Sequence, residues 1–394
     1  MKSGAWIIAV YLLVGVCLIR LTTDAESSLY GETTTPAQSG EPQLMAATYY
    51  SLQDKLRTSI SLNNKGIVPF EVRPTLFNLA GERLDVPPVT INPTSFRVFD
   101  LAEWASPGGS AFEQGSLQLF YRGKDLLLGA QIKMIDSDSS LIFDEQLTEP
   151  SSMRSSRLDG LWSLPVSGSE VRIVVSNTTD LRQVAMVNLD GITPKQEEAK
   201  ELILEPHQTL VLDPARDLID RMAVLMKAGG MTITHSGKPG ALIARAMIEN
   251  PSTGYSSSVQ FIDPSKSRSS KLHGAGLRIE ALEGEELTPV IVARNIGEKA
   301  ATLHGRISYT RKDGSRGVMP ILSAVLKAGE VRTWEIAEVA ALRRADIRPA
   351  GLEFEYNTQP GSVMVSALSV VRRGNQVFQI PMLDPSAQTS STGV

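Results

Sequence analysis

Cysteine is almost absent from this sequence. The 394 residues contain one cysteine, Cys17, which lies in an apolar stretch near the start of the chain. Because a disulfide needs two cysteines, no intrachain disulfide can form, and the body of the chain has no thiol for catalysis or metal binding. The stability of the fold must therefore come from packing and hydrogen bonding.

Long basic blocks are also missing. The chain has 39 lysine and arginine residues against 43 aspartate and glutamate residues, which gives a formal net charge of −4. Nucleic-acid binding requires a concentrated positive surface that neutralises phosphates. The even mixture of charges therefore argues for no nucleic acid among the partners.

Histidine is scarce, and the four residues do not form a short metal-binding motif. They are His207, His235, His273 and His304. In zinc motifs the ligands come in pairs separated by about two to five residues, and no two of these histidines are so close. We interpret them as turn or surface residues and predict no zinc site.

The familiar catalytic motifs are missing as well. The segment 237–241 (GKPGA) has Pro239 where a phosphate-binding loop needs serine or threonine after the lysine. The Gly-x-Ser-x-Gly motif of hydrolases does not occur. We therefore predict no catalytic residues and no cofactor, and we expect that the protein is not an enzyme.

One acidic run is a candidate for a metal site. Asp136, Asp138 and Asp144 are weak calcium candidates, because calcium prefers loops rich in carboxylate oxygens. A calcium loop of the EF-hand type needs glycine at its sixth position, whereas this run has Leu141 there. The alternative interpretation, a polar hairpin turn followed by an edge strand, is favoured.

The N-terminus has the pattern of an export signal. Lys2 precedes the apolar run 5–19, which would span about 22 Å as a helix and is shorter than a bilayer core of roughly 30 Å. We predict that residues 1–25 are a signal peptide or an N-terminal anchor, since Arg20 is unusual before a cleavage site. Lipidation at Cys17 is a further alternative. Membrane contact is expected only through residues 5–19, if they are uncleaved, and an extracytoplasmic location follows: secreted, periplasmic or membrane-anchored at the cell surface.

Three strand-prone runs recur along the chain, and each ends at an asparagine. The asparagines are Asn63, Asn177 and Asn295, which lie 114 and 118 residues apart. A glycine that opens another strand follows each of them after 52, 53 and 56 residues, at Gly115, Gly230 and Gly351. Because solenoid repeats are only about 20–50 residues long, this period indicates three small domains.

Within the repeats, apolar and polar residues alternate as in a strand with one buried face. Leu352, Phe354 and Tyr356 alternate with Glu353 and Glu355. This alternation predicts antiparallel β-sandwiches rather than helices.

Turn signals support the same interpretation. Asp190-Gly191 and Asp313-Gly314 favour tight hairpin turns, and Ala80-Gly81 takes the same place in the first repeat. A short helical pattern also recurs before each glycine-marked strand, at residues 100–104, 213–219 and 334–342. We expect a short helix there, where the chain crosses between two sheets.

Polar segments divide the chain. Residues 149–156 and 263–270 share a Pro-Ser-x-x-Arg-Ser-Ser pattern, and few contacts should cross such boundaries. The expected organisation is a signal peptide or anchor at 1–25, a polar linker at 26–45, β-sandwiches at 46–150, 151–264 and 268–385, and a disordered tail at 386–394.

These features resemble tandem bacterial extracellular immunoglobulin-like β-sandwich modules of the cell-adhesion-related type. The likeness rests on the strand that ends in asparagine, the glycine-turned hairpin, the step from Leu204 through Pro206 to Leu212, and the late glycine-marked strand. It covers about residues 46–385. It implies an all-β fold of three tandem immunoglobulin-like antiparallel β-sandwiches, each with a short helix in the inter-sheet crossover, and it brings no catalytic residues.

Aromatic residues are the candidates for ligand binding. Trp162, Tyr49 and Tyr50 could stack on sugar rings, and the alternative for Trp162 is that it fills a seam between two domains. The main hypothesis is a non-enzymatic exported or cell-envelope protein that acts as an adhesin, scaffold or spacer, with a protein or glycan at the cell surface as its partner. The alternatives are a carbohydrate-binding module array that is accessory to polysaccharide processing, and a hydrolase with a site between domains.

Overall fold

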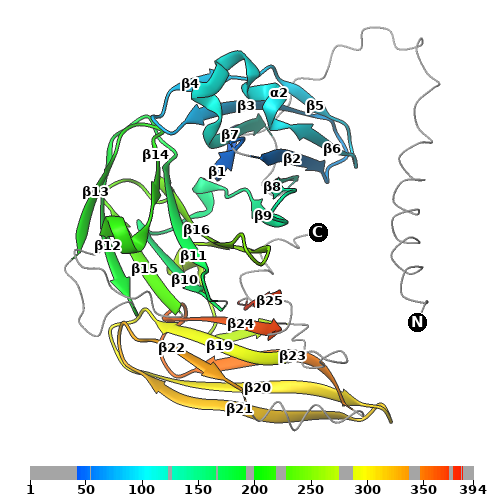
Figure 1. Ribbon diagram of the computed structural model, residues 1–394, viewed down its shortest axis with the longest axis vertical. Coiled ribbons are helices and arrows are strands. Elements are labelled where there is room, and N and C mark those ends of the chain that lie inside the picture. Colours follow the sequence, from blue (N-terminus) through cyan, green and yellow to red (C-terminus); the bar gives the residue numbers. More distant parts are fainter. Residues whose placement is uncertain are drawn as a thin grey trace. The chain divides into compact units, whose positions relative to one another are not determined.

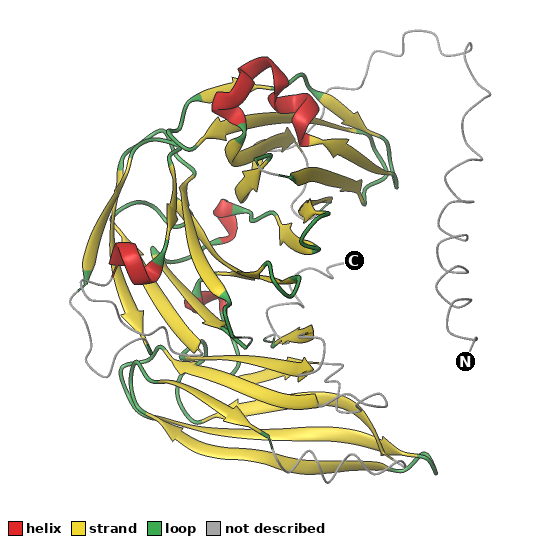
Figure 2. Cartoon of the chain, in the orientation of Figure 1, coloured by secondary structure: helices red, strands yellow, loops and turns green. Residues whose placement is uncertain are grey.

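The fold is built almost entirely from antiparallel β-strands, with a few short helical turns (Figures 1 and 2). The computed structural model describes residues 42–53, 55–122, 127–165, 167–191, 199–218, 228–274, 287–336, 347–371, 376–382 and 384. The predicted signal peptide and the predicted tail lie outside these residues. Within the described part of the chain, every helix is too short or too polar to cross a bilayer.

The first pair of sheets comprises residues 42–148. Sheet A has the strand order β1-β7-β3-β4, with β5 also paired to β3, and sheet B has the order β6-β2-β8-β9. The strands are β1 (Pro42–Ser51), β2 (Leu56–Asn64), β3 (Phe70–Asn78), β4 (Arg83–Asp85), β5 (Val89–Ile91), β6 (Phe96–Asp100), β7 (Gln114–Arg122), β8 (Leu128–Asp136) and β9 (Leu141–Gln146). Since β1 begins at Pro42, it takes in the last residues of the predicted linker 26–45.

The second pair comprises residues 157–262. Sheet C has the order β10-β15-β12-β13, and sheet D has the order β14-β11-β16-β17. The strands are β10 (Arg157–Ser163), β11 (Glu170–Asn177), β12 (Gln183–Asp190), β13 (Lys200–Leu204), β14 (Thr209–Leu212), β15 (Ala228–His235), β16 (Leu242–Asn250) and β17 (Tyr255–Gln260).

The third pair begins at Lys271 and is described as far as residue 384. Sheet E has the order β18-β23-β20-β21, and sheet F has the order β22-β19-β24-β25. The strands are β18 (Lys271–Gly274), β19 (Leu287–Asn295), β20 (Ala301–Arg311), β21 (Arg316–Leu326), β22 (Val331–Glu335), β23 (Ile347–Tyr356), β24 (Val363–Val371) and β25 (Gln376–Pro381). The same strand order therefore recurs in all three pairs.

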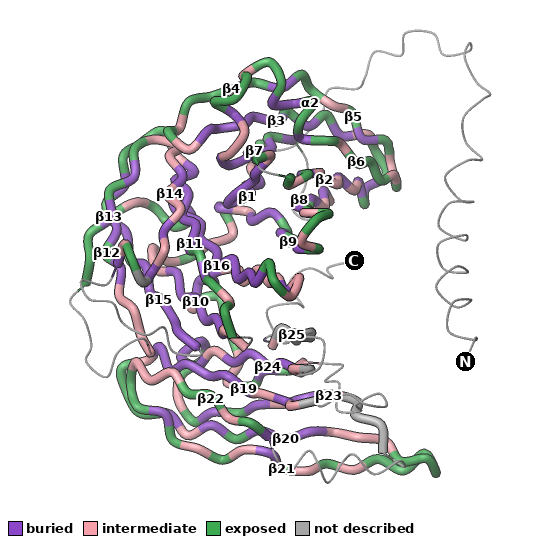
Figure 3. The backbone as a smooth tube through the Cα atoms, viewed as in Figure 1, coloured by how far each residue is buried: buried purple, intermediate pink, exposed green. Residues whose placement is uncertain are grey.

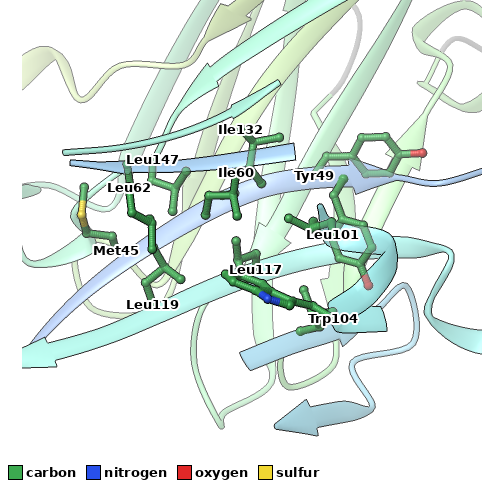
Figure 4. Close-up of a cluster of buried hydrophobic side chains, with 14 of the residues drawn as sticks. Met45, Tyr49, Ile60, Leu62, Leu101, Trp104, Leu117, Leu119, Ile132 and Leu147 are labelled. Atoms are coloured by element: carbon green, nitrogen blue, oxygen red, sulfur yellow. The ribbon is translucent and has the colours of Figure 1, made fainter. Parts of the chain in front are cut away.

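Each pair has its own hydrophobic core, to which both of its sheets contribute. Figure 3 colours the backbone by burial, and Figure 4 shows Ile60 and Leu62 of β2 among the buried side chains of the first core. Alternation along the strand puts every second side chain into the core, so Ser59 and Ser61 between them are not buried. The alternation predicted from Leu352 onwards is confirmed in β23, where the three apolar side chains are buried. Burial of this kind contributes roughly 1.5–3 kcal/mol for each large apolar side chain.

The helical predictions fare unevenly. Asp100 caps helix α2 (Leu101–Ala105) by accepting a hydrogen bond from the Ala102 N–H at 2.9 Å, as a helix-starting aspartate should. In the second pair the turn η3 (Pro214–Leu218) is a π-helix that follows Asp213, and residue 219 of the expected segment lies outside the described residues. The third helix was predicted to start too early, since Trp334 belongs to strand β22; residues 337–342 lie outside the described residues.

The repeated asparagine has a structural task, but the first copy is Asn64 rather than Asn63. In each pair the buried asparagine donates from Nδ2 to the carbonyl oxygen four residues later, and its Oδ1 accepts the N–H two residues later. Nδ2 also donates to a carbonyl at the end of a later strand or just beyond it: Ile91, Glu205 and Leu326 at 2.9–3.0 Å. The asparagine at the end of β2, β11 or β19 therefore joins the turn that follows it to the end of a strand in the opposite sheet of the same pair.

Candidate functional site

The calcium candidates lie on one hairpin but do not converge. Asp136 accepts hydrogen bonds from the Ser139 hydroxyl at 2.6 Å and the Asp138 N–H at 2.9 Å, which lower the pKa of its carboxyl group. Asp138 forms an ion pair with Lys55, and Asp144 faces Lys133 across the strand pair at 3.8 Å. Among the residues that the structure describes, there is no group of three or more histidine, cysteine, aspartate or glutamate side chains that could hold a metal.

The three aromatic candidates are buried in two different cores. Trp162 is 2% exposed in the second core, and its ring takes the place that a Cβ of Gly229 would fill, at 2.9 Å. Tyr49 and Tyr50 are buried in the first core, where Figure 4 shows Tyr49. The Tyr50 hydroxyl donates to the Phe112 carbonyl at 3.1 Å, and burial, with the nearby Tyr49, raises the pKa of Tyr50. Rings in these positions cannot stack on a sugar unless the core opens.

One histidine is buried without a polar partner. His235 ends strand β15, and neither ring nitrogen has a hydrogen-bond partner among the described residues. Burial lowers the pKa of His235 to about 4, because a charged imidazolium would lose its hydration there. Its environment keeps it neutral at physiological pH, and the isolated ring offers no base or ligand geometry.

Buried ion pairs lie between the sheet pairs, although the Pro-Ser segments predicted few contacts there. At the first joint, between the first and second pairs, Arg245 of β16 reaches Glu145 of β9 with Nε and Oε2 3.4 Å apart. Both side chains are buried, and Glu145 Oε1 also accepts the Thr48 N–H at 2.6 Å. Arg245 Nη1 donates to the Asp144 carbonyl at 2.9 Å. Burial lowers the pKa of Arg245, and the charge of Glu145 offsets part of that effect.

A turn of the second pair closes the other side of this joint. His207, which has a left-handed φ of 57°, stacks on Phe77 with the ring centroids 4.1 Å apart. Gln118 donates to the Thr178 carbonyl at 3.0 Å. A Cβ on Gly81 would lie 2.2 Å from the Pro206 carbonyl oxygen, so the hairpin of sheet A needs glycine at this close approach.

The second joint, between the second and third pairs, is organised around Arg294 of β19. Its side chain is 0% exposed and passes into the second pair, where it meets two carboxylates. Nε donates to Asp190 Oδ2 at 3.0 Å, and Nη1 lies 3.4 Å from Asp159 Oδ1. Further bonds run from the guanidinium to the Gly160 and Met231 carbonyls and to the Thr232 hydroxyl, at 2.7–3.0 Å. These bonds compensate for the hydration that the guanidinium loses, so its charge can be buried.

Apolar contacts surround the arginine. Leu161 and Ala228 of the second pair form a small buried cluster with Val292 and Leu368 of the third. A Cβ on Gly230 would lie 2.3 Å from Arg294 Cδ, so this glycine makes room for the inserted side chain. The glycine marker read from the sequence thus has a packing reason in the second pair.

A carboxylate also fastens the chain where it enters a pair. Asp263, at the end of the second pair, accepts the Arg154 and Ser155 N–H groups at 2.6 and 3.0 Å, and Asp384 does the same for Arg268 and Ser269 in the third pair. Burial alone would raise the pKa of Asp263, but the hydrogen bonds from Ser155 and Ser265 lower it. We call these two contacts the aspartate clamps.

Sequence reasoning missed both joint arginines. Arg294 was hidden in the strand Pro289–Asn295, yet a lone arginine in an otherwise apolar strand was a usable signal, because such a strand is buried on both faces. Arg245, which lies within a run of buried positions, carried the same signal. Within the described residues, both joints consist of ion pairs, hydrogen bonds and apolar contacts that hold two surfaces together.

Comparison with protein-family models and with curated proteins finds no match to this chain.

Proposed function

We propose that this chain is a non-enzymatic structural protein of the cell envelope or cell exterior, in which three tandem immunoglobulin-like β-sandwiches act as a rigid scaffold, adhesin stalk or spacer. The recurring strand order and the three separate cores support the sandwich assignment. The apolar run 5–19 with its preceding lysine supports export.

The proposal that the array is rigid rests on one observation: Arg294 is fully buried and is shared between Asp159 and Asp190. A guanidinium without water must keep its partners, because an uncompensated buried charge costs roughly 3–5 kcal/mol. The second and third sandwiches therefore have one strongly favoured relative geometry. A flexible tether would leave such a charge in solvent at the surface.

The first joint supports the same conclusion through different residues. Arg245 and Glu145 face each other in a buried site, although without hydrogen-bond geometry between Nε and Oε2. The His207–Phe77 stack and the close approach at Gly81 fix the other side. Two joints of this kind make a spacer whose length is set by the fold.

The test is solution X-ray scattering of the mature chain (residues 26–394), together with an Arg294→Ala variant. We expect scattering from wild type to fit one conformation, and the variant to show a broader distribution of pair distances. Arg306→Ala is the matched control, since Arg306 pairs with Glu353 on an exposed sheet face. A wild type that scatters as freely jointed domains would contradict the proposal.

Glycan binding stays a prediction that no contact in the described residues favours. A glycan array that gives no signal counts against it, and a signal abolished by Trp162→Ala in a folded variant counts for it. A screen with ester, glycoside and peptide substrates tests the non-enzymatic assignment, since turnover that survives repurification would overturn it.

A further inference from the structure

The two joints are built in the same way. At the first joint, the outer face of sheet D, with the turn before β14, contacts the end of the first pair. At the second joint, the outer face of sheet F, with the turn before β22, contacts the end of the second pair. We call the outer face of sheet B, D or F, together with the start of its edge strand β6, β14 or β22, the docking face of its pair.

The asparagine motif aligns the three docking faces residue by residue. The residues one and three positions before the motif asparagine are Ser176 and Val174 in the second pair, and Arg294 and Val292 in the third pair. All four side chains are buried, either against the preceding pair or next to the contact with it. The corresponding residues of the first pair, Asn63 and Ser61, remain partly exposed. The docking face of the first pair is thus the only one among the described pairs that is not covered.

That face carries exposed apolar side chains. Phe96 and Val98 of edge strand β6 are 64% and 57% exposed, and Ile67 and Val68 in the neighbouring turn are 89% and 51% exposed. A hydrogen bond from the Thr94 N–H to the Gly66 carbonyl at 3.3 Å joins this turn to the loop before β6. Clustered exposed apolar residues at a sheet edge indicate an interaction surface.

The same positions carry the contacts in the other pairs. By strand register, Phe96 corresponds to Thr209 and Val331. The Thr209 N–H donates to the Leu79 carbonyl of the first pair at 3.1 Å. Val331 lies in the apolar cluster of the second joint and against Gly191. In the first pair an exposed phenylalanine takes this place.

The covering partner at both joints is the end of a sheet pair, and among the described residues the end of the third pair takes part in neither joint. In the second pair that end contains Gly230 and the register-paired Asp190, which receive Arg294. The corresponding residues of the third pair are Gly351 and Ser308. A Cβ at Gly351 would lie 3.3 Å from the Gly274 carbonyl oxygen and 3.4 Å from the Ser308 hydroxyl, so this glycine, like Gly230, stands at a close approach.

We propose that the docking face of the first pair binds the end of the third pair in a second copy of this chain, so that copies associate head to tail. The inference rests on the rigid array proposed above, and it extends the joint geometry from within the chain to between chains. Because such a contact is heterologous, it can continue into an open assembly.

Sedimentation velocity of the mature chain over a concentration series tests the proposal. We expect the weight-average mass of wild type to rise with concentration, and Phe96→Asp to weaken association by at least about tenfold. Val325→Asp is the matched control, since Val325 is 55% exposed on strand β21, which neither joint uses. A wild type that stays monomeric, or a Phe96→Asp variant that associates like wild type, would overturn the proposal.

A mixing experiment tests the direction of the contact. Ser308→Arg fills the end of the third pair, which would bind the docking face, and leaves the docking face itself intact. Phe96→Asp disrupts the docking face and leaves the end of the third pair intact. Each variant alone should stay monomeric, and their mixture should form one-to-one pairs that grow no further; the absence of such pairs from folded variants would refute the head-to-tail arrangement. X-ray scattering from the monomer at low concentration separates the two proposals. A rigid wild type that never associates supports the rigid array and refutes head-to-tail association, whereas flexible joints refute both proposals.

Discussion

Removing the buried charge of Arg294 should destabilise the protein far more than removing an exposed arginine. Arg294→Met keeps the apolar length of the side chain but deletes the guanidinium. Asp190 then loses the cation that it faces, while Asp159 retains Arg157 at 2.8 Å. Breaking one side of a buried ion pair costs roughly 3–5 kcal/mol, because the remaining carboxylate stays away from water.

Urea unfolding followed by circular dichroism and tryptophan fluorescence measures this loss. The matched control is Arg306→Met, which removes an arginine from an exposed pair with Glu353 and should cost about 0–1 kcal/mol. We also expect the Arg294→Met variant to unfold in more clearly separated steps, since the joint no longer couples the second and third pairs.

A double variant separates the lost attraction from the stranded charge. Asp190→Asn in the Arg294→Met background removes the uncompensated carboxylate, so the two changes together should cost less than their sum by about 0.5–3 kcal/mol. The reasoning is refuted if Arg294→Met unfolds within about 1 kcal/mol of wild type, or if the two changes are simply additive.

Three further outcomes are expected from stability measurements. Because burial lowers the pKa of His235 from an ordinary 6.5 to about 4, the unfolded chain binds a proton below pH 6.5 that the folded chain does not bind, so the free energy of unfolding should be independent of this group above pH 6.5 and should fall by about 3 kcal/mol as the pH falls towards 4; His235→Leu should flatten this part of the pH profile, and an unchanged slope would contradict the assignment. Phe354→Asp should unfold the third pair through several kcal/mol of lost burial and a desolvated charge, whereas Glu355→Asp on the opposite face should be nearly silent; equal effects would deny that alternation sets the core. Gly81→Ala should destabilise by clearly more than Gly314→Ala, since both glycines have φ near 90° but only the first would push a Cβ into a neighbouring pair, and equal losses would show that strain alone is at work.

Local patterns predicted the strands well and their partners poorly. The period-2 alternation from Leu352 identifies a strand with one buried face, because that pattern depends only on the strand itself. Leu204 and Leu210 look equally like two arms of a hairpin, yet β13 and β14 belong to different sheets. Sheet membership is decided by distant strands, which a local pattern does not contain. Asn63 was preferred to Asn64 for a similar reason, since adjacent asparagines differ only in the turn that each one ties.

The candidate site residues show the same limit. Aromatic character made Trp162 and Tyr50 candidates for sugar binding, but the side of the strand that each occupies depends on the register, and here that side is the core. Polar, proline-containing segments suggested loosely joined domains. The contacts that fix the joints come instead from Arg245 and Arg294, which lie outside those segments, on faces that only the folded sheets bring together.

The aspartate clamps decide how this chain would respond to tension. Since Asp263 binds the backbone at Arg154 and Ser155, the polypeptide enters and leaves the second pair at one place. A pulling force that travels along the backbone can then pass from one linker to the next without stretching the strands between them. We expect the hydrogen bonds of each clamp to break before the force reaches the hydrophobic core.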